Sequence, residues 1–316
     1  MHTNPLARLS ETGYIPASMA LQIGIVGLPN VGKSTLFRAI TKKAVECANF
    51  PFCTIDPNVG VVDVPDARLE PLAKISESKR IIPSAIEFVD IAGLVRGASE
   101  GQGLGNAFLS HIRETDAIVQ VLRAFKDEEV IHVDGSVDPM RDRETIQTEL
   151  ALADLTVVEK RLETAEKQLR AEKNKELAVL VPALHRAKEA LENEQPLRKL
   201  DWNAEERRAL KSLALLTMKP MVFAVNVSET QLQNESWKNA VPELAKTEEV
   251  VPICAKMEQE FLDMSDEEKK EYLESVGQSA SGLDQLIVSA FRALDLIVFL
   301  TSGEMETRAW PVKNGT

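Results

Sequence analysis

Residues 27–34 of this chain read Gly27-Leu28-Pro29-Asn30-Val31-Gly32-Lys33-Ser34, which is the pattern Gly-x-x-x-x-Gly-Lys-Ser. Small residues in such a loop let successive backbone N–H groups converge on phosphates, and a following helix adds positive potential at its N-terminus. The preceding run, 21–26, is short and apolar like a buried parallel strand, and 34–43 has a helix-forming composition. The stretch therefore predicts a phosphate-binding loop between a strand and a helix, as in P-loop nucleoside triphosphatases.

The residue types in this loop predict separate tasks. A lysine at this position reaches the β- and γ-phosphates, and the hydroxyl of the following serine is a ligand for Mg²⁺. The predicted phosphate contacts are Asn30, Val31, Gly32, Lys33, Ser34 and Thr35.

A second motif, Asp90-Ile91-Ala92-Gly93, follows the apolar run 85–90. An aspartate at the end of a buried strand can hold Mg²⁺ through water, and the Gly93 amide can contact the γ-phosphate. Thr54 lies between the two motifs and is predicted to close on Mg²⁺, although an ordinary loop threonine is the alternative. The predicted metal ligands are therefore Ser34, Thr54 and, through water, Asp90.

The predicted base-recognition element is Asn226-Val227-Ser228-Glu229, after the apolar run 221–225. Guanine-specific relatives place Asn-Lys-x-Asp here, whereas this chain lacks the lysine and has an acid one methylene longer. A mis-sized acceptor leaves guanine donors unpaired, which favours adenine. A second loop, Cys254-Ala255-Lys256, is expected to face the base edge with the Ala255 amide. The predicted base contacts are Asn226, Val227, Glu229 and Ala255.

Strands that alternate with helices predict an α/β fold, with a mostly parallel sheet and helices on both faces. The middle of the chain differs, because apolar residues spaced 3-4-3-4 form two seams, one from Leu155 to Leu169 and one from Leu177 to Leu191. Such seams joined by a polar turn predict an antiparallel helical coiled-coil hairpin. Two amphipathic helices lying on the core are the alternative.

The same pattern predicts the domain limits. We expect a disordered leader at 1–18, a discontinuous G domain at 19–130 and 212–296, the helical insertion at 131–211, and a short C-terminal unit at 297–316. Residues 160–211 carry 13 Lys and Arg against 10 Asp and Glu, a balance of +3 within a chain of net charge −12. A locally basic segment on an acidic body suggests a docking arm.

Composition excludes several other classes of protein. The chain has 316 residues, 44% of them hydrophobic and 27% charged, as in ordinary globular proteins. No apolar run approaches the roughly 20 residues that cross a bilayer, so no membrane association is expected. Three scattered cysteines predict reduced thiols in a cytoplasmic protein. A net charge of −12 argues against a general nucleic-acid surface, and no DNA partner is expected.

These motifs together resemble the Obg-like ATPase (YchF) family of G domains, from residue 19 to about residue 310. The segments 49–58 and 90–98 resemble the switch segments of that family, and 226–229 resembles its altered base motif. The resemblance implies ATP preferred over GTP, a coiled-coil insertion, a C-terminal TGS domain, ribosome association and a part in translation or stress regulation. Only the opening strands of a TGS domain are matched, so we expect 297–316 to be the start of a truncated one.

The group that orients the attacking water is less obvious. Ras-like enzymes carry a glutamine after Asp-x-x-Gly, but this chain has Leu94 there. The candidates are His111, Gln102 and Gln120, with His111 taken as a tentative catalytic residue together with Lys33, Thr54 and Gly93. The alternatives are a surface role for His111 and a structural hydrogen bond for Gln120. In related G domains that use K⁺, an asparagine at the position of Asn30 helps to hold the ion.

The leading hypothesis is thus a slow Mg²⁺-dependent ATPase switch that associates with the ribosome or RNA. A GTPase of the same class is one alternative. A nucleotide-sensing RNA or ribosome adaptor, in which hydrolysis is incidental, is the other.

Overall fold

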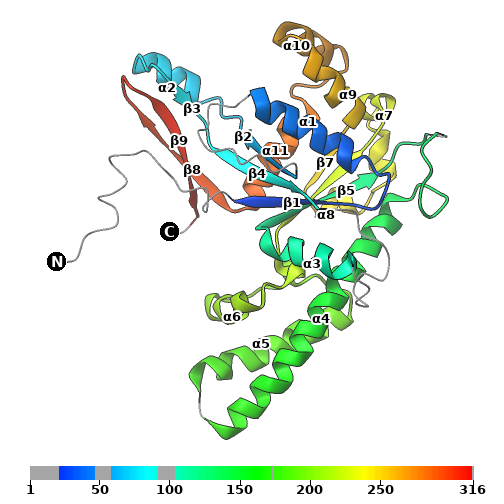
Figure 1. Ribbon diagram of the computed structural model, residues 1–316, viewed down its shortest axis with the longest axis vertical. Coiled ribbons are helices and arrows are strands. Elements are labelled where there is room, and N and C mark those ends of the chain that lie inside the picture. Colours follow the sequence, from blue (N-terminus) through cyan, green and yellow to red (C-terminus); the bar gives the residue numbers. More distant parts are fainter. Residues whose placement is uncertain (1–20, 47–57, 92–103, 128, 173, 315–316) are drawn as a thin grey trace.

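The computed structural model describes residues 21–46, 58–91, 104–127, 129–172 and 174–314. Its main feature is a six-stranded sheet in the order β2-β4-β1-β5-β6-β7 (Figure 1). β2 pairs with β4 antiparallel, and the other neighbours are parallel. The predicted α/β fold is confirmed. The strands are β1 (Gln22–Val26), β2 (Val59–Asp63), β4 (Ala85–Asp90), β5 (Ala117–Arg123), β6 (Met221–Asn226) and β7 (Val250–Ile253).

The central strands owe their position to continuous apolar sequence. β5 and β6 are buried along their whole length, which requires cover on both faces of the sheet. In Figure 1, α1 lies on one face and α3 and α4 lie on the other. The main helices are α1 (Lys33–Glu46), α2 (Leu69–Ile75), α3 (Leu104–Glu114), α4 (Pro139–Ala171), α5 (Lys175–Glu192), α6 (Ala204–Leu210), α9 (Ala255–Glu260), α10 (Asp266–Ser275) and α11 (Gly282–Ala293).

α4 and α5 form the predicted antiparallel hairpin, which extends away from the sheet in Figure 1. The seam residues Val158, Leu162 and Ala165 are buried with the α5 seam in a core of their own. α5 begins at Lys175 because the Asn174 side chain accepts from the N–H groups of residues 176 and 177 and so caps the helix. The reading as two helices lying flat on the core is wrong for this part of the chain.

The boundary between the two cores lies inside α4 rather than at residue 131. Ile146, Leu150 and Ala153 are buried with the sheet, whereas the seam from Val158 onward faces α5. The step of five residues from Ala153 to Val158 turns the helix by about 140° beyond a full turn, so the buried stripe changes face there. One continuous helix therefore belongs to the sheet at its start and to the hairpin at its end.

Asp154 fixes the return of the chain from the hairpin to the sheet. Its side chain is fully buried and accepts from the Leu216 N–H (2.8 Å), the Thr217 N–H (2.7 Å) and the Thr217 hydroxyl (2.8 Å). These bonds hold the segment that enters β6 against the middle of α4. Burial raises the pKa of Asp154, and the hydrogen bonds act in the opposite direction.

A second sheet contains most of the expected C-terminal unit. β8 (Leu296–Ser302) pairs antiparallel with β9 (Thr307–Lys313), with Phe299 opposite Trp310. A third strand, β3 (Ile81–Ile82), pairs parallel with β9 and is not predicted by the sequence analysis. The assignment of 297–316 to a TGS domain stays a prediction, and the leader 1–18 lies outside the described residues.

None of the helices in the described ranges has the combination of length and apolar sequence that spanning a membrane requires.

A buried carboxylate in α9 should make stability depend on pH. Glu258 accepts from the Gly282 N–H (2.7 Å) at the start of α11, and burial raises the pKa of Glu258 above its usual 4.5. The folded state therefore keeps a proton that the unfolded state releases, so stability falls as the pH rises through this range. With urea titrations at several pH values, we expect Glu258→Gln to gain stability relative to the wild type as the pH rises above 4.5. A difference that is constant with pH would contradict the assignment.

Candidate functional site

A cavity of about 890 Å³ lies at the carboxyl ends of β1, β5, β6 and β7, at the edge of the sheet where ligands bind in open α/β folds. It has the size of a small-molecule site. Three parts of the chain form its walls: the phosphate loop, the segment after β5, and the starts of the segments after β6 and β7. The lining residues are Leu28, Pro29, Asn30, Gly32, Lys33, Ser34, Thr35, Phe125, Lys126, Asp127, Val130, Asn226, Val227, Ser228, Glu229, Thr230, Cys254, Ala255, Lys256, Met257 and Glu260.

The predicted phosphate residues come together at the start of α1. Lys33 is the first residue of α1 and lines the cavity with Ser34. The Lys33 ammonium forms an ion pair with the Asp90 carboxylate at the end of β4, and both side chains are mostly buried. This pair brings together the two motifs that the sequence places 57 residues apart. The Ser34 hydroxyl and the Asp90 carboxylate are oxygen donors, the kind of ligand that Mg²⁺ prefers.

The turn of the phosphate loop depends on two left-handed residues. Gly32 has φ of +96° and Asn30 has φ of +63°. Glycine adopts positive φ without strain, and asparagine tolerates it better than most residues. The Asn30 side-chain amide donates to the Ile131 carbonyl (3.0 Å), which ties the exposed tip of the loop to the segment after β5. Val31 is fully buried, so its side chain belongs to the core.

Asn226 joins the phosphate loop to the second predicted base loop. Its Nδ2 donates to the Val31 carbonyl (3.0 Å), and its Oδ1 accepts from the Ala255 N–H (3.2 Å). The Ala255 N–H was expected to face the base edge, but in the structure it donates to the Asn226 side chain. A buried amide side chain needs both of its partners, so this asparagine fixes the two walls relative to each other.

Glu229 is exposed and lines the cavity just beyond β6. Its Oε1 accepts from Gln233 Nε2 (3.2 Å), one helical turn further on. Burial raises the pKa of Tyr272 of α10, and the Glu229 carboxylate acts in the same direction. The acid at the position of the guanine-reading aspartate is therefore bonded to a donor one turn away, and the neighbouring Val227 is buried.

The remaining predicted residues lie elsewhere. His111 is exposed on α3 and is not among the residues that line the cavity, so the tentative catalytic assignment is not supported. Gln120 is fully buried and accepts from Gln147 Nε2 (3.0 Å), the structural alternative for that residue. Thr54, Gly93, Leu94 and Gln102 lie outside the described residues.

Sequence reasoning missed one wall of the cavity. Phe125, Lys126, Asp127 and Val130, here called the wall segment, follow β5 and line the cavity beside the phosphate loop. The available signal was position: β5 lies between β1 and β6 in the sheet, so its carboxyl end must open into the same crevice.

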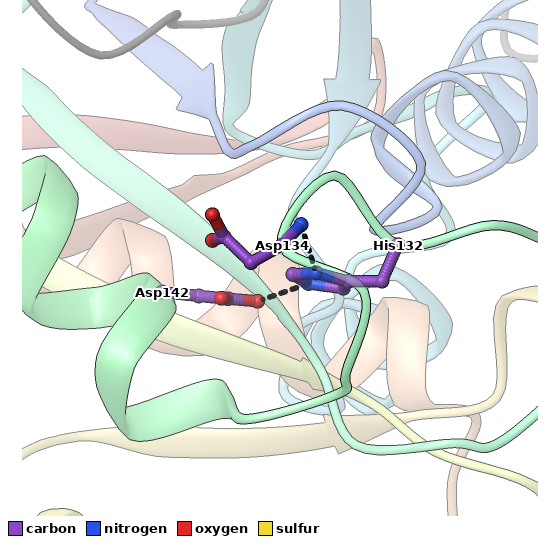
Figure 2. Close-up of side chains that lie close together, drawn as sticks. All are labelled: His132, Asp134 and Asp142. Atoms are coloured by element: carbon purple, nitrogen blue, oxygen red, sulfur yellow. Dashed lines mark hydrogen bonds and ion pairs between the residues drawn. The ribbon is translucent and has the colours of Figure 1, made fainter.

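Behind this wall lies a compact polar cluster, shown in Figure 2. His132 Nε2 is 2.8 Å from Asp142 Oδ2, and the Asp134 N–H donates to His132 Nδ1 (3.2 Å). Because Nδ1 accepts, Nε2 carries the hydrogen and donates to Asp142. The guanidinium of Arg141 lies 3.5 Å from the carboxylates of Asp134 and Asp142, so its single positive charge offsets part of their negative charge. The cluster joins the start of α4 to the segment that follows β5.

The phosphate loop, the Lys33–Asp90 pair and the sheet order define a P-loop nucleoside triphosphatase. A family model described as 50S ribosome-binding GTPase matches residues 22–181. The Ribosome-binding ATPase YchF of Bacillus subtilis (strain 168) is 49% identical over 302 residues, which cover 94% of this chain and 82% of that protein. This chain belongs to the family of YchF and the Obg-like ATPases.

Further relatives agree with this assignment. Obg-like ATPase 1 of Oryza sativa subsp. indica is 42% identical over 304 residues, covering 95% of this chain and 77% of that protein. The solved structure of the Schizosaccharomyces pombe YchF GTPase superimposes with a TM-score of 0.80 at 41% identity, covering 94% of this chain and 81% of that one.

Proposed function

We propose that this chain binds ATP with Mg²⁺, hydrolyses it slowly, and acts as a nucleotide-dependent switch at the ribosome in the cytoplasm. The observation that carries the proposal is the cavity itself, which is lined both by Lys33, the partner of Asp90, and by Glu229. That arrangement supports a phosphate end and a base end for one bound nucleotide. Relatives named as ribosome-binding ATPases support the choice of nucleotide and of partner.

The residues of this chain would divide the work as follows. Lys33 would bind the β- and γ-phosphates in place of the Asp90 carboxylate. Ser34, Asp90 through water and Thr54 would hold Mg²⁺, which would supply charge stabilisation at the phosphates. The Gly93 amide contacts the γ-phosphate. Asn226 holds the phosphate loop in register with the base loop, through the two bonds described above.

Base selection is the step that separates ATP from GTP. Calorimetric titration of the same protein with ATP and GTP, each with Mg²⁺, tests it, and equal or reversed affinities would overturn the preference for ATP. Restoring the guanine-reading pattern with Val227→Lys and Glu229→Asp should shift the ratio of the two dissociation constants toward GTP by about 10-fold or more. Gln233→Ala, which leaves the acid in place, is the matched control and should change the ratio much less.

A bound K⁺ at Asn30 is part of the proposal. The carboxamide nitrogen of Asn30 donates to the Ile131 carbonyl. The carboxamide oxygen of Asn30 is then the atom that would bind a cation beside the phosphates. Such a cation would supply positive charge that other enzymes take from an arginine finger. We expect faster ATP hydrolysis in K⁺ than in Na⁺ at equal ionic strength. Equal rates, or an Asn30→Ala variant that keeps the K⁺ effect, would remove the idea.

The alternative within the same chemistry is a GTPase. It is favoured by the descriptions of the matching family model and of the fission-yeast structure, both of which name GTPases. The altered motif at 226–229 favours ATP, and the titration above decides between them. For partner binding, we propose that the α4–α5 hairpin is the docking arm. Ribosome co-sedimentation with the Lys and Arg residues of 160–211 neutralised tests this role.

A further inference from the structure

A buried arginine at the end of β5 makes an unusual set of contacts. Arg123 is only 1% exposed. Its guanidinium donates to four backbone carbonyls: Nε to Phe125 (3.2 Å), Nη1 to Val130 (3.0 Å) and to Asn30 (3.4 Å), and Nη2 to Asp127 (3.3 Å). Three of these acceptors belong to the wall segment, and the fourth belongs to the phosphate loop.

Buried arginines are usually neutralised by a carboxylate. Among the residues that the structure describes, no ion pair to Arg123 is present within 4.0 Å, whereas Arg113 and Arg141 both have acidic partners. The Arg123 charge is instead balanced by carbonyl dipoles and by the Phe125 ring, whose centroid lies 4.4 Å from the guanidinium carbon. An arrangement with so many backbone acceptors indicates that the side chain is retained to hold the chain in one conformation.

The shape of the side chain matters for this task. The planar guanidinium carries five N–H donors that point outward in fixed directions, so one group can reach carbonyls on two different loops. A lysine has three donors on a single nitrogen and cannot span the same acceptors.

We propose that Arg123 is a positioning residue for nucleotide binding, whose guanidinium locks the wall segment against the phosphate loop before the nucleotide arrives. The inference rests on the proposed ATP site and adds to it a residue that touches neither phosphate nor base. A wall that is already in place lowers the entropy lost on binding. Removing Arg123 should therefore weaken binding, while the groups that act on the phosphates, Lys33 and Asp90, remain.

The test is steady-state kinetics and calorimetry on Arg123→Lys and Arg123→Gln. We expect both variants to raise the KM and the Kd for ATP by about 10-fold while kcat stays within about threefold. A merely structural defect would give the opposite result, because partial unfolding lowers the active fraction and hence kcat without changing KM. Wild-type KM in either variant would overturn the proposal; in the lysine variant it would do so because a positive charge without the guanidinium fork would then be sufficient.

Arg198 provides a matched control. It lies in the short 3₁₀ helix Leu197–Lys199, its side chain is 10% exposed, and its contacts are Gln147 (3.4 Å) and Glu248 (3.6 Å), outside the cavity. Arg198→Gln should leave the KM for ATP within about twofold of the wild type. If the wild type does not bind ATP, the proposed function is wrong. If the wild type binds ATP and the Arg123 variants bind it equally well, only the role of Arg123 is wrong.

A measurement on the wild type covers the case in which the variants do not fold. The Arg123 Nε–H is buried and hydrogen-bonded, so its NMR signal should exchange slowly with water and should shift when ATP and Mg²⁺ are added. A signal that exchanges as fast as that of exposed Arg38, or that does not move at saturating ATP, would overturn the proposal.

Discussion

Replacing Lys33 with alanine should lower kcat/KM for ATP hydrolysis by about 100-fold or more. The reason lies in the position of the ammonium group, which the first turn of α1 presents to the cavity and which pairs with Asp90 at the end of β4. In a partly buried site, this fixed charge interacts with the transferring phosphate more strongly than it would in water. Without it, the charge that develops on the γ-phosphate loses a partner that no neighbouring side chain of the loop can replace.

The control for this prediction is on the same helix. Lys43 lies in the last turn of α1 and pairs with Asp284 of α11, away from the cavity lining. Lys43→Ala removes the same kind of charge and the same kind of ion pair, and we expect its kcat/KM to stay within about twofold of the wild type. If Lys33→Ala kept more than a tenth of wild-type kcat/KM, the phosphate end of the cavity would be wrongly assigned.

The sequence predicted those parts of the fold that have a local signal. The short apolar runs 21–26, 85–90 and 221–225 each precede a motif of polar or small residues, and the structure has them as β1, β4 and β6. β3 has only two residues, and its partner in β9 is more than 220 positions away in the sequence. A strand this short has no alternation of apolar and polar residues from which it could be predicted. The change of buried face inside α4 is visible in the spacing of its apolar residues, but only once the partner of each half is known.

The residues of the candidate site also fall into those with a local sequence signal and those without one. The phosphate and base motifs could be predicted because their chemistry requires particular side chains at particular spacings. Arg123 could not, because its acceptors are backbone carbonyls and carbonyls carry no sequence signature. The bond from the Ala255 N–H to Asn226 was not foreseen for a similar reason. The position of a loop does not show whether its backbone donor meets a base or a side chain.

The second large effect concerns Gly32. Its φ of +96° is strained for any residue with a Cβ, and a Cβ placed there would overlap the Nδ2 atom of Asn226 far inside van der Waals contact. Gly32→Ala should therefore abolish measurable ATP binding and destabilise the fold by about 2 kcal/mol or more, seen as a lower urea midpoint. Either the loop must shift or Asn226 must give up its bond to the Val31 carbonyl.

A double-mutant cycle separates these two causes. Asn226→Ala alone loses both of its hydrogen bonds and should be destabilised by about 1–3 kcal/mol. In the background of Gly32→Ala, however, Asn226→Ala also removes the overlapping atom. The loss of unfolding free energy in the double variant should therefore be smaller than the sum of the two single losses by about 1 kcal/mol. The backbone strain at residue 32 remains, and ATP binding should not return. Strict additivity of the two free energies would mean that the overlap is relieved by movement of the loop, and that Asn226 does not fix the geometry of the phosphate loop.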